Sequence, residues 1–281
     1  MNIIIKNTIL QATISTLGAE LQSVIKKETG REYIWYGKEE FWTGRSPILF
    51  PFVGRLLDDE YFIGVKRYSL PKHGFARKKE FILTNKGESF AEFTLSDDED
   101  TIKNYPYHFE LVITFELVEN KIKVNHKVVN KNDAEMYFSL GAHPAFNIEI
   151  GDKLVFEKKE NFEAFKMDEN SILKDKKEYL GTTNEIVITN DIFKKDAIMF
   201  ENLKSNYLFI NCKGENIVKF NLNNAPLLGI WAKPGAPYVC IEPWYGIDDN
   251  AHATKKIEDK FAIEKLEKGE EFNYFWDAEI I

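Results

Sequence analysis

The sequence predicts an all-β protein with the architecture of a large antiparallel β-sandwich. Three observations carry this prediction. Apolar and polar residues alternate in many short runs, polar turns separate these runs, and helical periodicity is weak throughout the 281 residues. Short strands that follow one another at regular spacing are typical of sandwiches and related large β-architectures.

The clearest alternation lies within 108–129. Every second residue from Phe109 to Leu117 is apolar, a polar turn follows at 119–121, and the alternation resumes from Ile122 to Val128. This pattern predicts a β-hairpin. Further strands are expected at Asn2–Ile5, Ile9–Ile14, Glu32–Tyr36, Phe81–Thr84, Phe90–Leu95, Met136–Leu140, Leu154–Phe156, Ile186–Ile188, Tyr207–Asn211, Val218–Leu222, Leu228–Trp231, Tyr238–Glu242 and Glu271–Trp276.

Helix is expected in two short pieces only. Asp97–Asn104 begins with an acidic run of N-cap character and ends before Pro106, and a second piece is expected within Ala251–Leu266. No linker rich in Pro, Ser or Gly divides the chain, and no repeat of fixed period occurs. We therefore expect one domain over residues 1–281.

Composition excludes several classes of protein. Residues are 44% hydrophobic and 29% charged, which suffices for a sizeable core, and the net charge of −8 disfavours a nucleic-acid partner. No apolar run is long enough to span a membrane, and the first residues lack the pattern of a signal peptide, so a cytoplasmic protein is expected. Cys212 and Cys240 are expected to be reduced thiols. Neither zinc-site spacing nor a nucleotide-binding loop occurs, so no metal or cofactor is expected.

Three segments break the strand pattern with Gly, Pro and polar residues: Gly44–Leu56 together with Pro71–Arg77, Gly141–Asn147, and Cys240–Asp249. Each places an ionisable residue beside Pro or Gly at the end of an expected strand. A rigid turn of this kind fixes the direction of a side chain, and local departures from the pattern are where functional residues are expected.

His143 and Glu242 stand out within these segments. Each follows an apolar strand and is followed directly by Pro, and a carboxylate next to apolar and aromatic residues needs a polar reason to be there. For His143 the alternative is a histidine that caps its strand. His73 is equally compatible with an ordinary surface turn, and the alternation predicts a half-buried, hydrogen-bonded role for His126.

No Gly-x-Ser-x-Gly nucleophile motif occurs, so the remaining candidates are one or two histidines, one or two carboxylates and an arginine. This set supports proton transfer without a covalent intermediate. The 5 Trp and 12 Tyr could in addition line a cleft in which aromatic faces stack on a sugar ring.

Six segments together resemble the aldose 1-epimerase (mutarotase) superfamily, in particular its bacterial branch related to the LacX proteins. They are GAELQSV, SPILFPFVGRL, KHGFAR, GAHPAFN, LGIWAKPGAPYVCIEPWYGIDD and LEKGEEFNYFW, in family order from residue 18 to residue 276. The resemblance implies a large antiparallel β-sandwich with an open carbohydrate cleft.

The resemblance also implies roles for individual residues. Glu242 looks like the family's general base and His143 like its general acid. Arg55 and His73 look like residues that hold the sugar, and Asp196, or else the nearby Asp191, matches the family's sugar-binding aspartate. Arg77 completes a motif shared with relatives that act on hexose 6-phosphates.

The implied activity is interconversion of the α and β anomers of an aldohexose, with a free sugar favoured. A hexose-6-phosphate 1-epimerase and a carbohydrate-binding protein without turnover are the alternatives; a glycoside hydrolase would need a second well-placed carboxylate. The implied partner is a small sugar, with neither nucleic acid nor membrane, and the chain is expected to be a monomer or homodimer.

Overall fold

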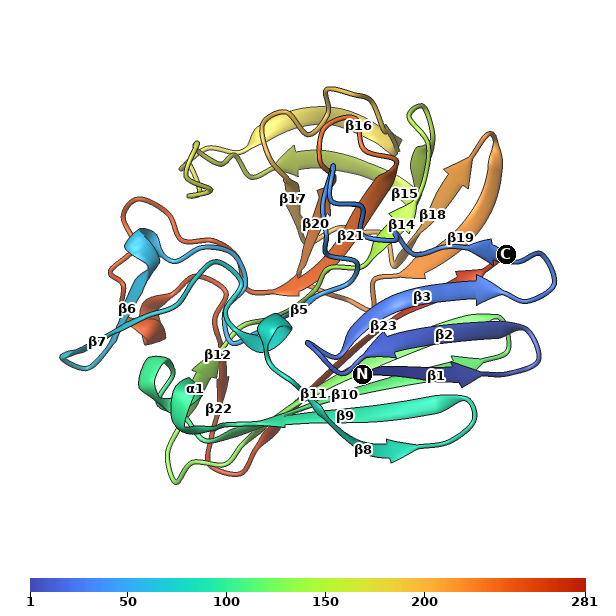
Figure 1. Cartoon of the computed structure of the whole chain (residues 1–281). Coiled ribbons are helices and arrows are strands. Elements are labelled where there is room, and N and C mark those ends of the chain that lie inside the picture. Colours follow the sequence, from blue (N-terminus) through green and yellow to red (C-terminus); the bar gives the residue numbers. More distant parts are fainter.

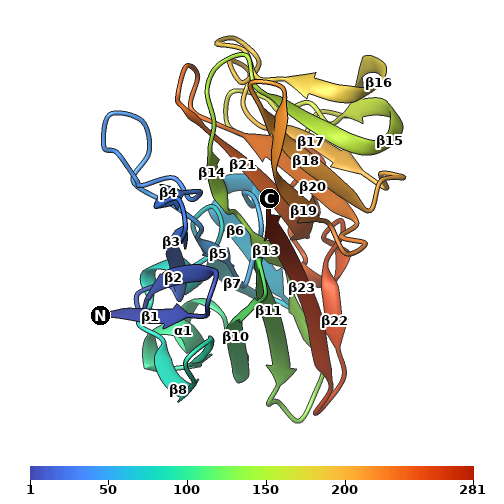
Figure 2. The ribbon, with the colours of Figure 1, turned by 90° about the vertical axis from the view of Figure 1, so that its right-hand side faces the viewer.

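The computed structural model describes residues 1–281 and consists mostly of antiparallel strands (Figure 1). This confirms the all-β prediction. The largest sheet has nine strands in the order β16-β15-β18-β19-β23-β11-β10-β9-β8. Figure 2 shows β10, β11, β23, β19 and β18 following one another across the molecule. The bounds are β8 (Ile82–Lys86), β9 (Phe90–Ser96), β10 (Phe109–Val118), β11 (Lys121–Asn130), β15 (Lys153–Ala164), β16 (Glu178–Val187), β18 (Tyr207–Cys212), β19 (Glu215–Asn221) and β23 (Glu271–Ile280).

A six-stranded sheet has the order β17-β20-β21-β13-β5, with β14 also paired to β21. Its strands are β5 (Ile48–Leu49), β13 (Leu140–Ala142), β14 (Ala145–Asn147), β17 (Ile198–Glu201), β20 (Leu227–Trp231) and β21 (Tyr238–Tyr245). A four-stranded sheet contains β1 (Asn2–Lys6), β2 (Leu10–Ser15), β3 (Glu20–Lys26) and β4 (Arg31–Glu32). Two small pairs complete the fold: β6 (Glu60–Ile63) with β7 (Lys66–Ser69), and β12 (Met136–Phe138) with β22 (Glu264–Leu266).

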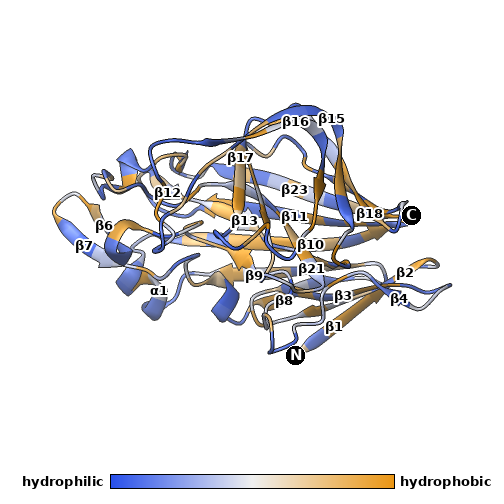
Figure 3. Cartoon of the chain, turned by 90° about the horizontal axis from the view of Figure 1, so that it is seen from above, coloured by the Kyte–Doolittle hydropathy of each residue, from blue (hydrophilic) through white to orange (hydrophobic).

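Helical structure is short, as the sequence predicts. Helix α1 (Glu99–Asn104) begins at Asp98, whose side chain accepts hydrogen bonds from the backbone N–H groups of Asp100 and Thr101. The 3-10 turns are η1 (Leu57–Asp59), η2 (Ala76–Lys78) and η3 (Ile257–Asp259). The region 251–266 therefore holds a single 3-10 turn before β22, a smaller helical piece than expected. Helix α1 and the β6–β7 hairpin lie at the end of the molecule opposite the C-terminus (Figures 1 and 3).

The predicted hairpin is confirmed as β10 and β11, which pair from Phe109 opposite Asn130 to Val118 opposite Lys121. Every second residue of β11 is buried, which is the alternation the sequence carries. Several strands differ from expectation. β5, β6, β7, β14, β17 and β22 lie outside the predicted ranges, and the strand expected at Glu32–Tyr36 is only β4 (Arg31–Glu32). β3 lies in a region with no predicted strand, and β16 begins at Glu178, eight residues before the predicted one, because its exposed residues do not alternate.

The main hydrophobic core contains buried residues from Ile3 to Ile280 and draws on the nine-, six- and four-stranded sheets. Hydrophobic colour is concentrated in the middle of the molecule in Figure 3, around β10 and β21. No helix is both long and apolar enough to cross a membrane. His126 departs from the prediction of a half-buried, hydrogen-bonded side chain: it is 1% exposed, and neither ring nitrogen has a hydrogen-bond partner.

Candidate active site

A cleft of about 230 Å³ lies over the six-stranded sheet. It collects residues from all three of the atypical sequence segments. The residues that line it are Trp42, Lys72, His73, Arg77, His143, Met167, Asp196, Ala197, Trp231, Glu242, Trp244 and Asp248.

Glu242 lies in the middle of β21, opposite Gly229 of β20, and its side chain is 1% exposed. The sequence places Glu242 at a strand end, and this position is wrong, because β21 continues through Pro243 to Tyr245. Backbone N–H groups of neighbouring residues point to opposite edges of a strand, so residues two positions apart share an edge. Proline has no N–H, and at Pro243 the missing group would lie on the same edge of β21 as the N–H of Ile241. That edge faces the gap between β13 and β14, where Pro243 costs no ladder hydrogen bond.

The same gap holds His143. β13 ends at Ala142 and β14 begins at Ala145, and both pair with β21 on either side of the interruption. The carbonyl of Pro144 accepts the N–H of Ile241 at 3.1 Å and ties the interruption to the sheet. His143 therefore leaves the sheet directly beside Glu242, with its direction fixed by ordered strands on each side.

The two side chains meet. Nε2 of His143 lies 3.2 Å from Oε2 of Glu242, and the side chains are 9% and 1% exposed. Burial lowers the pKa of the His143 imidazole to about 3 and raises the pKa of the Glu242 carboxyl well above its usual range. The carboxylate does not hold His143 in its charged form, contrary to what proximity alone predicts, because desolvation outweighs the attraction. Burial thus disfavours the charged form of both side chains.

Tryptophans form the walls around His143. The ring of Trp42 lies 5.0 Å from the imidazole at an interplanar angle of 31°, and Trp231 presents its edge at 5.8 Å and 82°. Trp244 packs against His73 with ring centroids 5.6 Å apart. Flat apolar faces around a polar pair suit a sugar, which has apolar C–H faces and a polar rim.

His73 lies in the cleft in an unusual backbone conformation, with φ of 69°. Its Nδ1 accepts the N–H of Gly54 at 3.1 Å, and its own N–H donates to the Gly54 carbonyl at 2.9 Å. Because Nδ1 is an acceptor, the neutral ring carries its hydrogen on Nε2. Burial lowers the pKa of His73 well below its ordinary value, and the positive charges of Lys72 and Arg77 lower it further. His73 is thus a fixed neutral donor.

The two candidate arginines are placed differently. Arg77 lines the cleft, with one terminal nitrogen donating to the Lys72 carbonyl at 3.0 Å and a buried Nε without a partner. Arg55 does not line it. Its guanidinium bonds the Asp59 carboxylate at 3.0 Å and the Asn170 carbonyl at 3.2 Å. Only the backbone of Arg55 contacts a cleft residue, because its N–H donates to the carboxylate of Asp248.

Of the two candidate aspartates, Asp196 lines the cleft and Asp191 does not. Asp196 has φ of 86°, and its carboxylate accepts hydrogen bonds from the Ala197 N–H at 2.8 Å and the Ser171 hydroxyl at 2.9 Å. Asp191 is exposed and paired with Lys194. Of the two aspartates that the sequence offers, Asp196 is therefore the one placed to contact a ligand in the cleft.

Asp248 is a cleft residue that sequence reasoning did not single out. It is fully buried; Oδ1 accepts the Arg55 N–H at 2.6 Å, and Oδ2 has no partner. Burial raises the pKa of its carboxyl. Its segment, Cys240–Asp249, is visibly atypical, but nothing local distinguishes Asp248 from Asp249. The cleft tryptophans and Lys72 were missed for the same reason, since each looks like an ordinary core or surface residue.

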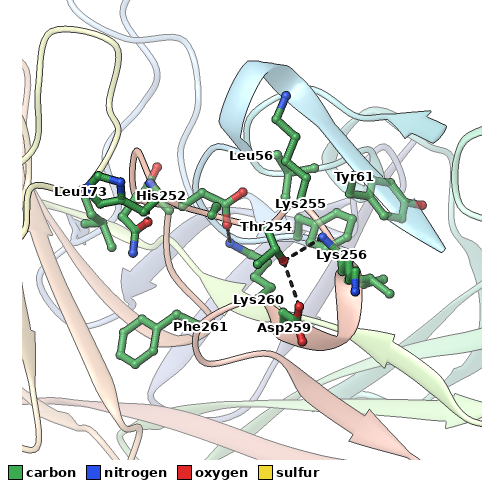
Figure 4. Close-up of a pocket in the computed structure, with 16 residues that line it drawn as sticks. Leu56, Tyr61, Leu173, His252, Thr254, Lys255, Lys256, Asp259, Lys260 and Phe261 are labelled. Atoms are coloured by element: carbon green, nitrogen blue, oxygen red, sulfur yellow. Dashed lines mark hydrogen bonds and ion pairs between the residues drawn. The ribbon is translucent and has the colours of Figure 1, made fainter. Parts of the chain in front are cut away.

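A second hollow of about 180 Å³ shares Asp248 with the cleft (Figure 4). Most of its charged groups already have partners, and Lys255 pairs with Asp58 and Glu60. Lys260, with a side chain 4% exposed, bonds Asp249 at 2.7 Å and the Ile247 carbonyl at 2.6 Å, while Thr254 bonds Asp259. These partners hold a loop in place, whereas the cleft brings together unpartnered atoms of Arg77, His143, Glu242 and Trp244, none of which lines the second hollow. Chemistry is therefore expected in the cleft.

Comparison with known proteins identifies the family and the fold. The family model described as aldose 1-epimerase matches residues 1–273. Protein LacX of Lactococcus lactis subsp. lactis is 31% identical over 95% of each chain. A galactose mutarotase related enzyme from Lactobacillus acidophilus is 33% identical, with a TM-score of 0.95 over 100% of this chain and 97% of that one. A galactose mutarotase-like protein from Lactobacillus casei is 27% identical, with a TM-score of 0.95 over the whole of both chains.

These likenesses run the length of the chain and include the strands and turns that build the cleft. The sequence motifs, the mutarotase-like sandwich and the family match thus lead to one conclusion: this chain belongs to the aldose 1-epimerase family, in its LacX-like branch.

Proposed function

We propose that this chain is an aldose 1-epimerase that interconverts the α and β anomers of an aldohexose, with His143 and Glu242 as the acid–base pair. The observation that carries the proposal is the 3.2 Å approach of His143 Nε2 to Glu242 Oε2 within a tryptophan-walled cleft. Family membership supports the reaction class. We expect the protein to act in the cytoplasm as a monomer or homodimer.

The proposed reaction has two proton transfers in each direction. Glu242 takes the proton of the C1 hydroxyl while His143 gives a proton to the ring oxygen, and the bond between C1 and that oxygen breaks. The open-chain aldehyde turns about its C1–C2 bond. The two groups then exchange roles, and the ring closes as the other anomer. Positioned acid–base groups each contribute about 10²–10⁴-fold to a rate.

Substrate binding would prepare the pair for this reaction. Burial favours the protonated form of Glu242, whose Oε1 is buried and has no hydrogen-bond partner. A sugar hydroxyl that donates to Oε1 stabilises the carboxylate and lowers its pKa. The shared proton then moves to His143, which becomes the acid as Glu242 becomes the base. An unpartnered oxygen beside the pair is what this step requires.

Three further residues are assigned to holding the sugar. His73 would donate from Nε2 to a ring or hydroxyl oxygen, and Asp196 would accept from hydroxyls with the lone pairs its own hydrogen bonds leave free. Arg77, with a buried and unpartnered Nε, would donate in a fixed fork. Arg55 receives no such role, since its guanidinium is bonded outside the cleft.

The acid–base assignment is tested with Glu242→Gln and His143→Asn. Each keeps hydrogen-bonding capacity and loses proton transfer, so kcat should fall at least about 10²-fold with a smaller change in KM. The double variant should be little worse than the poorer single one, because the two residues act as a unit. Turnover is measured by polarimetry on freshly dissolved α-glucose and α-galactose.

Glu264→Gln is the matched control. Glu264 is a partly buried carboxyl on β22 whose pKa burial also raises, and it lies outside the cleft. This variant should keep wild-type turnover. If Glu242→Gln also keeps wild-type turnover at an unchanged Tm, the assignment is refuted and the cleft is a carbohydrate-binding site without catalysis.

A hexose-6-phosphate 1-epimerase is the second candidate, and one observation favours it. Two cations, Lys72 and Arg77, line the cleft, where a phosphate could find both. Asp196, an acidic side chain that lines the same cleft, opposes an anion. A panel of free and 6-phosphorylated aldoses separates the two. A kcat/KM for a 6-phosphate well above that for the free sugar, lost selectively in Lys72→Ala and Arg77→Ala, would establish the second candidate.

A further inference from the structure

Three different metal-binding side chains converge at the acid–base pair. One ligand atom each of His143, Cys240 and Glu242 lie within 4.8 Å of one another, and all three residues are buried. Cys240 and Glu242 are two positions apart on β21, so their side chains point to the same face of the sheet. Cys240 does not line the cleft, and its exposure is 0%. The thiol is thus within reach of the pair and hidden from solvent.

Two atoms of this cluster lack partners. Nδ1 of His143 and Oε1 of Glu242 are buried and make no hydrogen bond. Buried polar atoms without a partner are uncommon in folded proteins and destabilise the fold. An imidazole, a carboxyl with an unpaired oxygen and a thiol together form a donor set that can coordinate a cation.

The donor types point to a particular cation. One nitrogen, one sulfur and one oxygen ligand suit Zn²⁺, whereas Mg²⁺ and Ca²⁺ prefer oxygen ligands. Ligands of a tetrahedral zinc ion lie about 3.3–3.6 Å apart for bonds of about 2.0–2.3 Å. Nε2 of His143 and Oε2 of Glu242 already lie 3.2 Å apart, and the whole cluster fits within 4.8 Å, so binding requires the sulfur of Cys240 to move closer to the other two ligand atoms. The fourth position would face the cleft.

We infer that His143, Cys240 and Glu242 form a Zn²⁺ site, and that an ion bound there inhibits the enzyme. The inhibitory effect rests on the proposed function, since the ion would occupy the lone pairs that carry the proton transfers. Binding releases the thiol proton and the proton shared by His143 and Glu242 to solvent. The charge of the ion is then balanced by one thiolate and one carboxylate. The sequence gives no zinc-site spacing because His143 and Cys240 are 97 positions apart and meet only through the pairing of β14 with β21.

Zinc binding and inhibition are measured separately on the full chain freed of metal with EDTA. Equilibrium dialysis against buffered ZnCl₂ gives stoichiometry and affinity, and polarimetry gives turnover at the same free Zn²⁺. The wild-type chain should bind one Zn²⁺ tightly and lose turnover in proportion to occupancy, while MgCl₂ at the same concentration has no effect. Co²⁺ in place of Zn²⁺ should give a sulfur-to-cobalt charge-transfer band.

Cys240→Ala should weaken Zn²⁺ binding at least about tenfold, abolish the charge-transfer band, and retain its own zinc-free turnover at Zn²⁺ concentrations that inhibit the wild type. Cys212→Ala is the matched control. Cys212 is half-buried, lies at the end of β18 and is absent from the cluster, so its removal should change neither binding nor inhibition. If Cys240→Ala does not fold, Cys240→Val fills the same space without a ligand.

Equal zinc affinity in the wild type and Cys240→Ala would overturn the proposal, as would loss of binding in Cys212→Ala. Dialysis and the cobalt spectrum need no turnover, so a chain that binds Zn²⁺ through Cys240 but never anomerises sugars would refute the proposed function and leave the metal site standing. A chain that anomerises sugars and is indifferent to Zn²⁺ would refute the metal site alone.

Discussion

His126 should make the folded protein sensitive to acid. It lies in the core on β11, packed against Tyr274 with ring centroids 5.8 Å apart, and neither ring nitrogen has a hydrogen-bond partner. Burial lowers the pKa of His126 from 6.5 to about 4, against a smaller opposing effect of the Val124 and Tyr274 backbone. The unfolded chain therefore binds a proton at this residue first. Stability is lost as the pH falls below about 6.5, and the loss ends near pH 4, where the folded protein also binds the proton.

The magnitude follows from the two pKa values. A histidine with a pKa of 6.5 when unfolded and about 4 when folded destabilises the protein by about 3 kcal/mol on acidification from pH 7 to pH 4. His126→Leu removes this contribution. Urea unfolding at pH 7, 6, 5 and 4 should show the variant gaining on the wild type by about that amount at the acid end.

The same substitution at His252, which is 77% exposed, is the control and should leave the pH dependence of the wild type unchanged. The reasoning is refuted if the curves of the wild type and His126→Leu stay parallel from pH 7 to pH 4. Because His126 does not line the cleft, His126→Leu also separates acid loss of activity through unfolding from loss through the chemistry.

Two further predictions concern residues around the cleft. Arg77→Lys should lower kcat/KM at least about tenfold, because the planar fork of the guanidinium is lost in the cleft. Arg55→Lys should keep kcat/KM within about threefold of the wild type, because the Arg55 guanidinium bonds the partly exposed Asp59 instead. If polarimetry shows the larger loss for Arg55→Lys, Arg55 belongs to the site. Lys260→Met should lower the free energy of unfolding by about 3 kcal/mol, since it leaves the buried carboxylate of Asp249 without its cation. Urea unfolding indistinguishable from the wild type would contradict this second prediction, and Lys260→Met combined with Asp249→Leu should recover part of the loss.

The fold could be predicted where strands have one buried and one exposed face. β10 and β11 satisfy this condition, and their alternation marked both strands and the turn between them. β16 does not, because most of its residues are at least partly exposed and no pattern of burial is imposed on them. β21 was also difficult to predict, for the opposite reason. It is buried on both faces, so its sequence has no alternation, and Pro243 appears to end a strand that in fact continues.

The candidate site was predictable only as far as each residue carries a local signal. His143 and Glu242 carry one, since a polar residue before Pro in an apolar setting is visible in the sequence. The difference between Arg55 and Arg77 has no such signal. Both lie in atypical segments, and only the fold decides that one guanidinium turns to Asp59 and the other to the cleft. In the sequence Cys240 looks like an ordinary core residue. Its proximity to His143 follows only from the pairing of β14 with β21.

The reciprocal bonding of His73 and Gly54 provides a natural probe of the cleft. The amide proton of Gly54 points at an imidazole nitrogen 3.1 Å away, whereas most amide protons in a sheet point at carbonyl oxygens. In ¹⁵N-resolved nuclear magnetic resonance spectra, this one resonance should respond to any change in the ring of His73, because a proton on Nδ1 would break the bond. A ligand that engages Nε2 should therefore be visible at a single glycine peak, before any turnover is measured.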